Sequence, residues 1–298
     1  YSPVLPLFIS APLSSKFFFI PYLPNFLFHS FSYSPSNVFS IFFSSPVCVL
    51  FISFILTNIL VRILQQKNIN NPWILVITGL MTGFPNGAYI CSWYNKNNPE
   101  NRLGDMLAGI INIPSPAFLI SYVYINILEK CISLPMFLAL TYTPVILCSY
   151  MAILLFRDKD NKKDNAPHIK NDKKLIFHFF EEAVDSSINT ALKLGAYVII
   201  FSVIVNIIMH FSQSNTAGLL ISYLFEISNG LAIIKNAGIP MNITVLLTVL
   251  LDAFGGVCII MQTKSICSSY ISIKKYIYQK LVLCIVTLAM TYLLIYVL

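Results

Sequence analysis

Apolar residues dominate the chain in eight runs that are separated by short polar or basic segments. Within the runs, apolar and polar positions do not alternate as they do in strands, which argues against a membrane β-barrel. Roughly 20 apolar residues suffice for a helix to cross the hydrocarbon core of a bilayer, so all eight runs are candidates for the membrane. They cover residues 47–61, 73–92, 107–128, 134–156, 187–211, 217–235, 240–262 and 281–298.

Helix breakers interrupt two of these runs. The first break is Gly83-Phe-Pro-Asn-Gly87, and the second is Glu226-Ile-Ser-Asn-Gly230. A helix break at membrane depth frees backbone N–H and C=O groups, each of which costs several kcal/mol in hydrocarbon. Such a break is tolerated where protein or a watery cavity satisfies those groups, and transporters place binding sites there. We therefore expect the two breaks to approach each other in the protein interior and to carry the function.

The distribution of Lys and Arg predicts how the runs cross the membrane. Residues 157–174 hold seven Lys or Arg and are therefore predicted to be cytoplasmic. If run 217–235 crossed fully, a later group of basic residues would lie outside, whereas a re-entrant hairpin returns that group to the cytoplasm. Its members are Lys264, Lys274, Lys275 and Lys280.

The same reasoning applies to run 73–92 in the first half. A re-entrant hairpin there keeps the basic residues on both sides of it in the cytoplasm, namely Arg62, Lys67, Lys96 and Arg102. The two hairpins then enter from opposite faces, as in the inverted repeats of many transporters. The sequence predicts an all-α polytopic membrane protein, an inverted repeat of helix–re-entrant hairpin–helix with about six spanning helices plus two re-entrant hairpins.

Four divisions of the chain follow from this pattern. A Pro- and Phe-rich N-terminal segment is followed by the first membrane repeat with a connecting helix, a basic cytoplasmic linker, and the second repeat with a C-terminal helix. They cover residues 1–46, 47–156, 157–174 and 175–298.

Composition supports a membrane protein and removes several classes of function. The chain is 57% hydrophobic and 10% charged, against about a quarter charged in soluble domains. The net charge of +7 fits basic cytoplasmic loops. The sequence has no cluster of basic residues on one face of the kind that binds nucleic acid. The seven Cys and four His are scattered, so we expect no metal and no cofactor. Because no nucleophile–base pair is visible either, we expect no enzyme.

Polar residues near the breaks are the candidate ligand-binding residues, because polar groups inside a membrane are costly and mark pathways. These are Asn86, Gly87, Asn112, Ser115, Glu226, Ser228, Asn229 and Gln262. The candidate helix-break residues are Gly83, Pro85, Pro116, Gly230, Gly255 and Gly256. The alternative is structural, since such side chains can cap freed backbone groups and paired glycines can permit close helix contact. Asp252 is a weaker candidate, because a shifted helix would bring it to the headgroup region.

At these positions the chain resembles the sporulation integral membrane protein YlbJ family. Residues 79–88 are similar to its Gly-Tyr-Pro-x-Gly-Ala block, and residues 112–118 to its Asn-Asn-x-x-Pro-x-Phe block. Further similarity lies in its second half, which is similar to the nucleoside recognition, or gate, domain of several transporters. That similarity covers residues 181–186, 193–203, 226–230 and 254–256, with Gln262. The chain departs from the family pattern at Phe84, Tyr89, Ile113 and Ile260. Tyr89 stands where the family commonly has a Lys, and Ile260 stands where it commonly has a His.

The resemblance implies a multipass protein needed for normal spore formation, located in the bacterial cell membrane of the forespore or mother cell. We expect a transporter or channel-like protein whose partners are the lipid bilayer and a small polar solute, nucleoside-like or other. The alternative is a non-transporting membrane scaffold for spore envelope assembly. A scaffold would tolerate Glu226→Gln and Asn86→Ala, whereas a transporter would lose activity.

Overall fold

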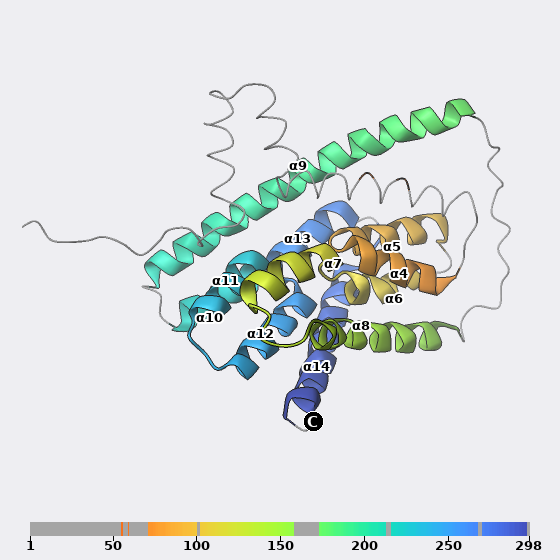
Figure 1. The fold of residues 1–298 in the computed structure, drawn as a ribbon. Helices are drawn as coiled ribbons and strands as arrows, with labels where there is room; N and C mark the ends of the chain where they lie inside the picture. The colour runs from red at the N-terminus through yellow and green to blue at the C-terminus, as the bar shows by residue number, and fades with distance from the viewer. Residues whose placement is uncertain are drawn as a thin grey trace, which may run out of the picture. The chain divides into compact units, whose positions relative to one another are not determined.

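The computed structural model describes residues 71–99, 102–157, 173–212, 216–267 and 270–296, with positions 55 and 59 (Figure 1). All regular structure in these ranges is helical, which confirms the all-α prediction. Residues 1–46, most of run 47–61 and linker residues 158–172 lie outside the described residues.

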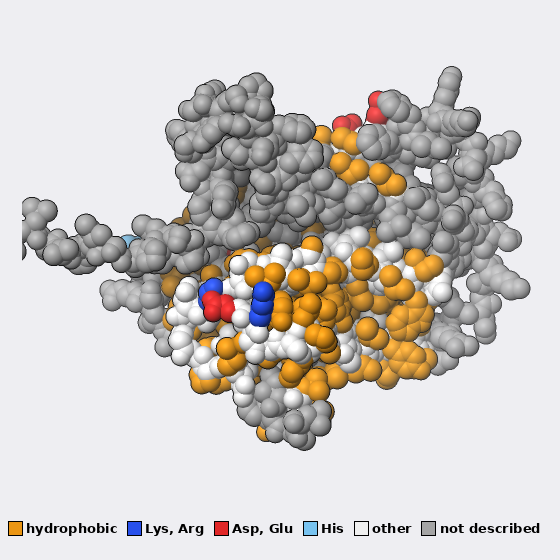
Figure 2. All heavy atoms as spheres, viewed as in Figure 1, with side chains coloured by type: hydrophobic (Ala, Val, Ile, Leu, Met, Phe, Trp, Pro, Cys, Tyr) orange, Lys and Arg blue, Asp and Glu red, His pale blue; other side chains and the backbone are white. Residues whose placement is uncertain are grey.

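Five helical segments in the described part are long and apolar enough to cross a membrane: Leu103–Ile127, Leu134–Phe156, Ser187–Phe211, Met241–Cys267 and Ile273–Leu294. Figure 2 shows hydrophobic side chains over much of the described surface that faces the viewer. Large apolar side chains such as Leu155, Leu192 and Ile285 are exposed. A surface of this kind suits lipid tails rather than water, and the chain is an integral membrane protein.

The first break separates two short helices, α4 (Pro72–Thr82) and α5 (Asn86–Asn97). Asn71 begins α4, because its side chain accepts a hydrogen bond from the N–H of Trp73 at 3.0 Å and a proline follows it. Gly83 ends α4 at φ 73°, a backbone conformation that favours glycine. The two helices have 11 and 12 residues, too few to cross a bilayer, and they pack against each other.

The second break separates α10 (Thr216–Phe225) from α11 (Ile227–Asn236). These helices have 10 residues each and also pack against each other. The break consists of Glu226, whose backbone is extended. Gly230, expected at the break, lies inside α11. There its missing Cβ permits close packing, since a Cβ would come within 2.6 Å of the carbonyl oxygen of Tyr223.

A broken membrane segment follows each pair of short helices. In the first half, α6 (Leu103–Ile111) ends at Asn112, and the chain resumes helix as α7 (Pro116–Phe118) and the π-helix η2 (Leu119–Ile127). In the second half, α12 (Met241–Phe254) ends at Gly255 in the left-handed conformation, and α13 (Gly256–Cys267) follows. Run 107–128 is thus two helical pieces, and the helix resumes at Pro116, one of the predicted helix-break residues.

Three long helices complete the described fold: α8 (Leu134–Arg157), α9 (Lys173–Phe211) and α14 (Ile273–Tyr296). α14 begins at Ile273, well before the apolar run that starts at residue 281, because a buried stripe of side chains extends into its polar first turns. It packs against α6, α8 and α12, so it contacts the broken segment of each half. α9, the long green helix of Figure 1, contacts α10 and α13.

Candidate functional site

Asn112, at the end of α6, joins three helices that the sequence separates widely. Its side-chain Oδ1 accepts a hydrogen bond from the N–H of Ala88 in α5 at 3.3 Å. Its Nδ2 donates to Thr263 Oγ1 in α13 at 3.3 Å and to the Tyr276 hydroxyl in α14 at 2.8 Å. Asn112 is fully buried, and both its amide hydrogens have protein partners. The break in α6 is therefore held by contacts to both halves of the chain.

Lys280 connects the two broken segments directly. Its side chain in α14 is fully buried, and Nζ donates to the carbonyl oxygen of Asn112 at 2.5 Å and to that of Ala253 at 2.9 Å. Each carbonyl lies at or next to a break, where no helical N–H is available to it. The charge pattern placed Lys280 in a cytoplasmic loop, whereas the structure buries it. The missed signal is a stripe along α14 at helical spacing, which also contains Tyr276, Thr287 and Thr291.

The first pair of short helices packs its connecting segment onto the break in α6. A Cβ at Gly83 would come within 2.5 Å of the backbone nitrogen of Ser115, and one at Gly87 within 2.9 Å of the carbonyl oxygen of Ile111. Asn86 is buried at the start of α5, directly after Pro85. Ser115 caps α7 by accepting a hydrogen bond from the N–H of Phe118 at 3.4 Å, and Pro116 is the first residue of that helix.

Glu226 caps α11. One carboxylate oxygen accepts from the N–H of Ser228 at 3.1 Å, and the other accepts from the N–H of Asn229 at 2.8 Å. The amide of Asn229 also donates to Glu226 at 2.9 Å and to Ser202 of α9 at 3.4 Å. Glu226 is buried, and an acidic side chain at a helix N-terminus is favoured by the helix dipole. These contacts support the capping interpretation of Glu226.

We expect Glu226→Ala to lower the free energy of unfolding by about 1–2 kcal/mol, because two N–H groups lose their acceptor. Glu226→Gln keeps one acceptor oxygen and should lose less. Thermal unfolding of the detergent-solubilised protein, followed by tryptophan fluorescence, measures both. Equal unfolding temperatures for Glu226→Ala and wild type would contradict the capping role.

The remaining predicted site residues lie at or after the break between α12 and α13. Gly256 approaches the second pair of short helices, since a Cβ there would come within 3.2 Å of the carbonyl oxygen of Phe225. Gln262 is buried in α13, and its Nε2 contacts Cys258 Sγ at 3.3 Å. Tyr122 of η2 donates to the carbonyl oxygen of Ser228 at 3.5 Å, which brings the first broken segment to the second break.

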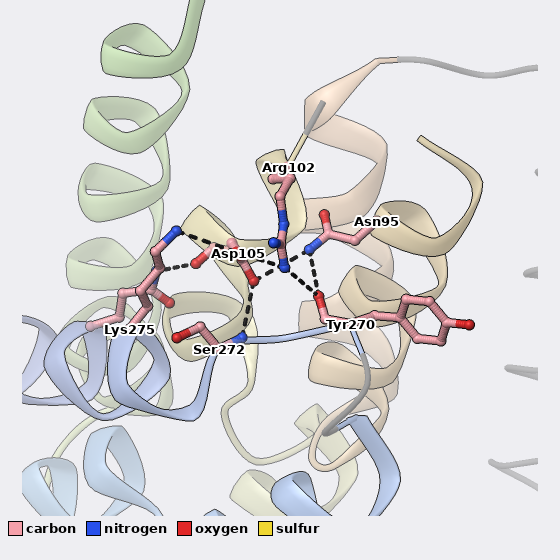
Figure 3. Close-up of polar contacts among 7 residues, drawn as sticks. Asn95, Arg102, Asp105, Tyr270, Ser272 and Lys275 are labelled. Atoms are coloured by element: carbon pink, nitrogen blue, oxygen red, sulfur yellow. Dashed lines mark hydrogen bonds and ion pairs between the residues drawn. The ribbon is translucent and has the colours of Figure 1, made fainter. Parts of the chain in front are cut away.

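A second polar cluster lies where the chain between α5 and α6 meets the chain between α13 and α14 (Figure 3). At its centre is Asp105, only 1% exposed, which pairs with Arg102 at 3.2 Å and Lys275 at 3.3 Å. Asp105 also accepts from the N–H of Ser272 at 3.1 Å. The carbonyl oxygen of Tyr270 accepts from Arg102 at 3.3 Å and from Asn95 at 2.9 Å. Sequence reasoning did not single out Asp105, because its partners Ser272 and Lys275 lie 167 and 170 residues further along the chain.

Replacing Asp105 by Asn should lower the free energy of unfolding by about 1–3 kcal/mol, because a buried acceptor of charged hydrogen bonds is lost. The exposed Asp185 of α9 offers a matched control, and Asp185→Asn should leave stability unchanged. Unfolding temperatures in detergent at low and high salt check this. A loss of stability of the same size in both variants would contradict the assignment.

The far end of the first broken segment meets the end of α11. Lys235, near the end of α11, forms an ion pair with Glu129, just beyond η2, at 2.8 Å, and donates to the carbonyl oxygen of Asn126. The Lys235 ammonium lowers the pKa of the Glu129 carboxyl, through the hydrogen bond between the two side chains and through its positive charge. Both side chains are partly exposed to solvent, so the ion pair adds little stability. It shows that the end of α11 lies next to the chain that follows η2.

Comparisons of the chain with protein-family models, with curated proteins and with solved structures find no match.

Proposed function

We propose that the chain is a membrane transporter for a small polar solute, built from two inverted repeats. Each repeat consists of a pair of short helices, a broken membrane segment and a long helix. The order is α4–α5, α6–η2 and α8 in the first half, and α10–α11, α12–α13 and α14 in the second. The observation that carries the proposal is the meeting of both broken segments on Lys280 in the protein interior.

The contacts at the two ends support opposite directions for the broken segments. At one end, the start of α6 meets the loop after α13 through Asp105 and Ser272. At the other end, the chain just after η2 meets the end of α11 through Glu129 and Lys235. The segment α6–η2 therefore leads from the first end to the second, and α12–α13 leads back. An inverted repeat requires this antiparallel arrangement.

Contacts of α4 and α5 support a re-entrant hairpin. Asn95, near the end of α5, bonds to Tyr270 at the Asp105 end. Trp73, at the start of α4, stacks on Tyr150 in the half of α8 that leads away from Glu129. Both outer ends of the pair thus lie toward the Asp105 end, while Gly83 and Gly87 contact the break in α6. A hairpin that enters and leaves by one face has this geometry.

Broken helices and paired hairpins at mid-depth are the devices with which many transporters bind solutes and alternate access. Phe84 from the first break packs against the apolar cluster that contains Ile227 from the second, as expected if the two breaks surround one site. The resemblance to the YlbJ family supports a role in the membrane of a sporulating bacterium. The gate-domain similarity favours a nucleoside-like solute.

The proposal is tested by solute uptake into proteoliposomes. A panel of nucleosides and other small polar solutes should identify at least one that enters with the wild-type protein and not with empty liposomes. Asn86→Ala and Glu226→Gln should reduce that uptake strongly while still inserting. Absence of uptake across the panel, or uptake untouched by both substitutions, would contradict the proposal.

The second candidate is a non-transporting scaffold for spore envelope assembly, and one observation favours it. The polar groups of Asn112 and the carboxylate of Glu226 are bound to protein groups in this structure, as structural caps would be. A scaffold would tolerate Glu226→Gln and Asn86→Ala in a sporulation assay, whereas a transporter would not.

A further inference from the structure

Asp252, near the end of α12, is a fully buried carboxyl group without a hydrogen-bond partner for either oxygen among the described residues. The sequence made Asp252 a weaker candidate than Glu226, and the structure buries its side chain inside the protein. An ionised carboxylate in an apolar interior is very costly unless it is paired, and such groups exist there in the neutral form instead. Ionisable residues at membrane depth mark ion pathways and proton relays.

Other polar groups without partners accompany Asp252. Thr248 lies one helical turn earlier on α12, so its hydroxyl shares a face with the carboxyl group. The Thr248 and Tyr142 hydroxyls are buried, and neither has a partner in the described part of the chain. Tyr142 lies on α8, which packs against α12, and the Tyr223 hydroxyl of α10 donates to the carbonyl oxygen of Leu247 in α12 at 2.8 Å. A group of unpaired buried oxygens is unusual in a native protein and calls for an explanation such as a bound water, an ion or a functional role.

The charged and titratable groups from the remaining neighbours of α12 are already engaged. Lys280 of α14 bonds to the carbonyl oxygen of Ala253, next to Asp252, and to that of Asn112. Cys284 of α14 contacts the carbonyl oxygen of Leu250. From α11, Glu226 caps its own helix and Lys235 pairs with Glu129. No described cation is within ion-pair distance of Asp252.

From this arrangement we infer that Asp252 is the site of one exchangeable proton that couples to solute movement. The carboxylic acid releases H⁺ and becomes a carboxylate, and no other bond is made or broken. Glu226 is less suited to this role, because both of its oxygens already accept hydrogen bonds from backbone N–H groups. The inference rests on the proposed transport function and adds the coupling ion to it.

Infrared spectroscopy of the protein in liposomes tests the inference without knowledge of the solute. At neutral pH, wild type should show the C=O stretch of a buried protonated carboxylic acid, and the band should shift in D₂O. The band should be absent in Asp252→Asn and retained in Glu226→Gln. Because Asp252→Asn removes the acid altogether, Asp252→Glu serves as a second variant and should move the band rather than abolish it.

Three results would overturn the inference. They are the absence of such a band in wild type, its persistence in Asp252→Asn, and a band that appears only when sodium is removed, which would make the group a sodium site. A band with the expected behaviour combined with no uptake of any solute would leave the proton site standing and contradict the transport function. Solute uptake by a protein that lacks the band would support the transport function and contradict the proton site at Asp252.

Discussion

Replacing Asn112 by Leu should lower the free energy of unfolding by about 2–4 kcal/mol. Leu has a similar volume but leaves the N–H of Ala88 and the hydroxyls of Thr263 and Tyr276 without the partner they have in the native protein. At about 0.6 kcal/mol per hydrogen bond within a membrane protein, three lost bonds cost about 2 kcal/mol. Unpaired polar groups in a dry interior raise the cost toward about 4 kcal/mol.

Asn97→Leu is the matched control for this substitution. Asn97 is exposed, and its side chain donates only to the carbonyl oxygen of Trp93 within its own helix. Thermal unfolding in detergent should therefore separate the two variants clearly. Similar unfolding temperatures would mean that Asn112 does not hold α5, α13 and α14 together.

The second large effect is expected for Lys280→Met. Methionine keeps the length of the side chain but removes the ammonium that satisfies the carbonyl oxygens of Asn112 and Ala253. Leaving two buried acceptors unpaired should cost about 2–4 kcal/mol. The substitution also removes a buried charge, whose desolvation opposes folding, but we expect the loss from the two unpaired acceptors to be larger.

Lys274→Met on the same helix provides the control, because Lys274 is exposed. The unfolding temperature of Lys280→Met should fall well below that of Lys274→Met. A Lys280→Met protein as stable as wild type would mean that the two breaks do not depend on Lys280 for their carbonyl partners.

Local sequence signals predicted the helices and the breaks but not the contacts between them. Gly83, Pro85 and Gly255 identified breaks because glycine and proline act on their own backbone. Gly230 was predicted to be part of a break, but it lies inside α11. A glycine in a helix can permit close packing as well as end the helix.

The partners of the breaks could not be predicted, because they come from the other half of the chain. Asn112 was identified as a candidate from the prolines that follow it, yet Tyr276 and Lys280 lie more than a hundred and fifty residues away. Charge statistics assigned Lys280 to a loop, since lysine is rarely buried without a partner. Asp252 was underrated for a related reason, because burial depth depends on how α12 packs against α8 and α14.

The central claim is that two pairs of short helices enter the membrane from opposite faces and each leaves by the face it entered. Labelling of single introduced cysteines with a membrane-impermeant maleimide, in vesicles of both orientations, tests it most directly. Cysteines at Asn71, Asn97 and Lys274 should react from one face, and cysteines at Glu129 and Asn236 from the other. Reaction of the Asn71 and Asn97 positions from opposite faces would show that α4 and α5 cross the membrane and would contradict the account.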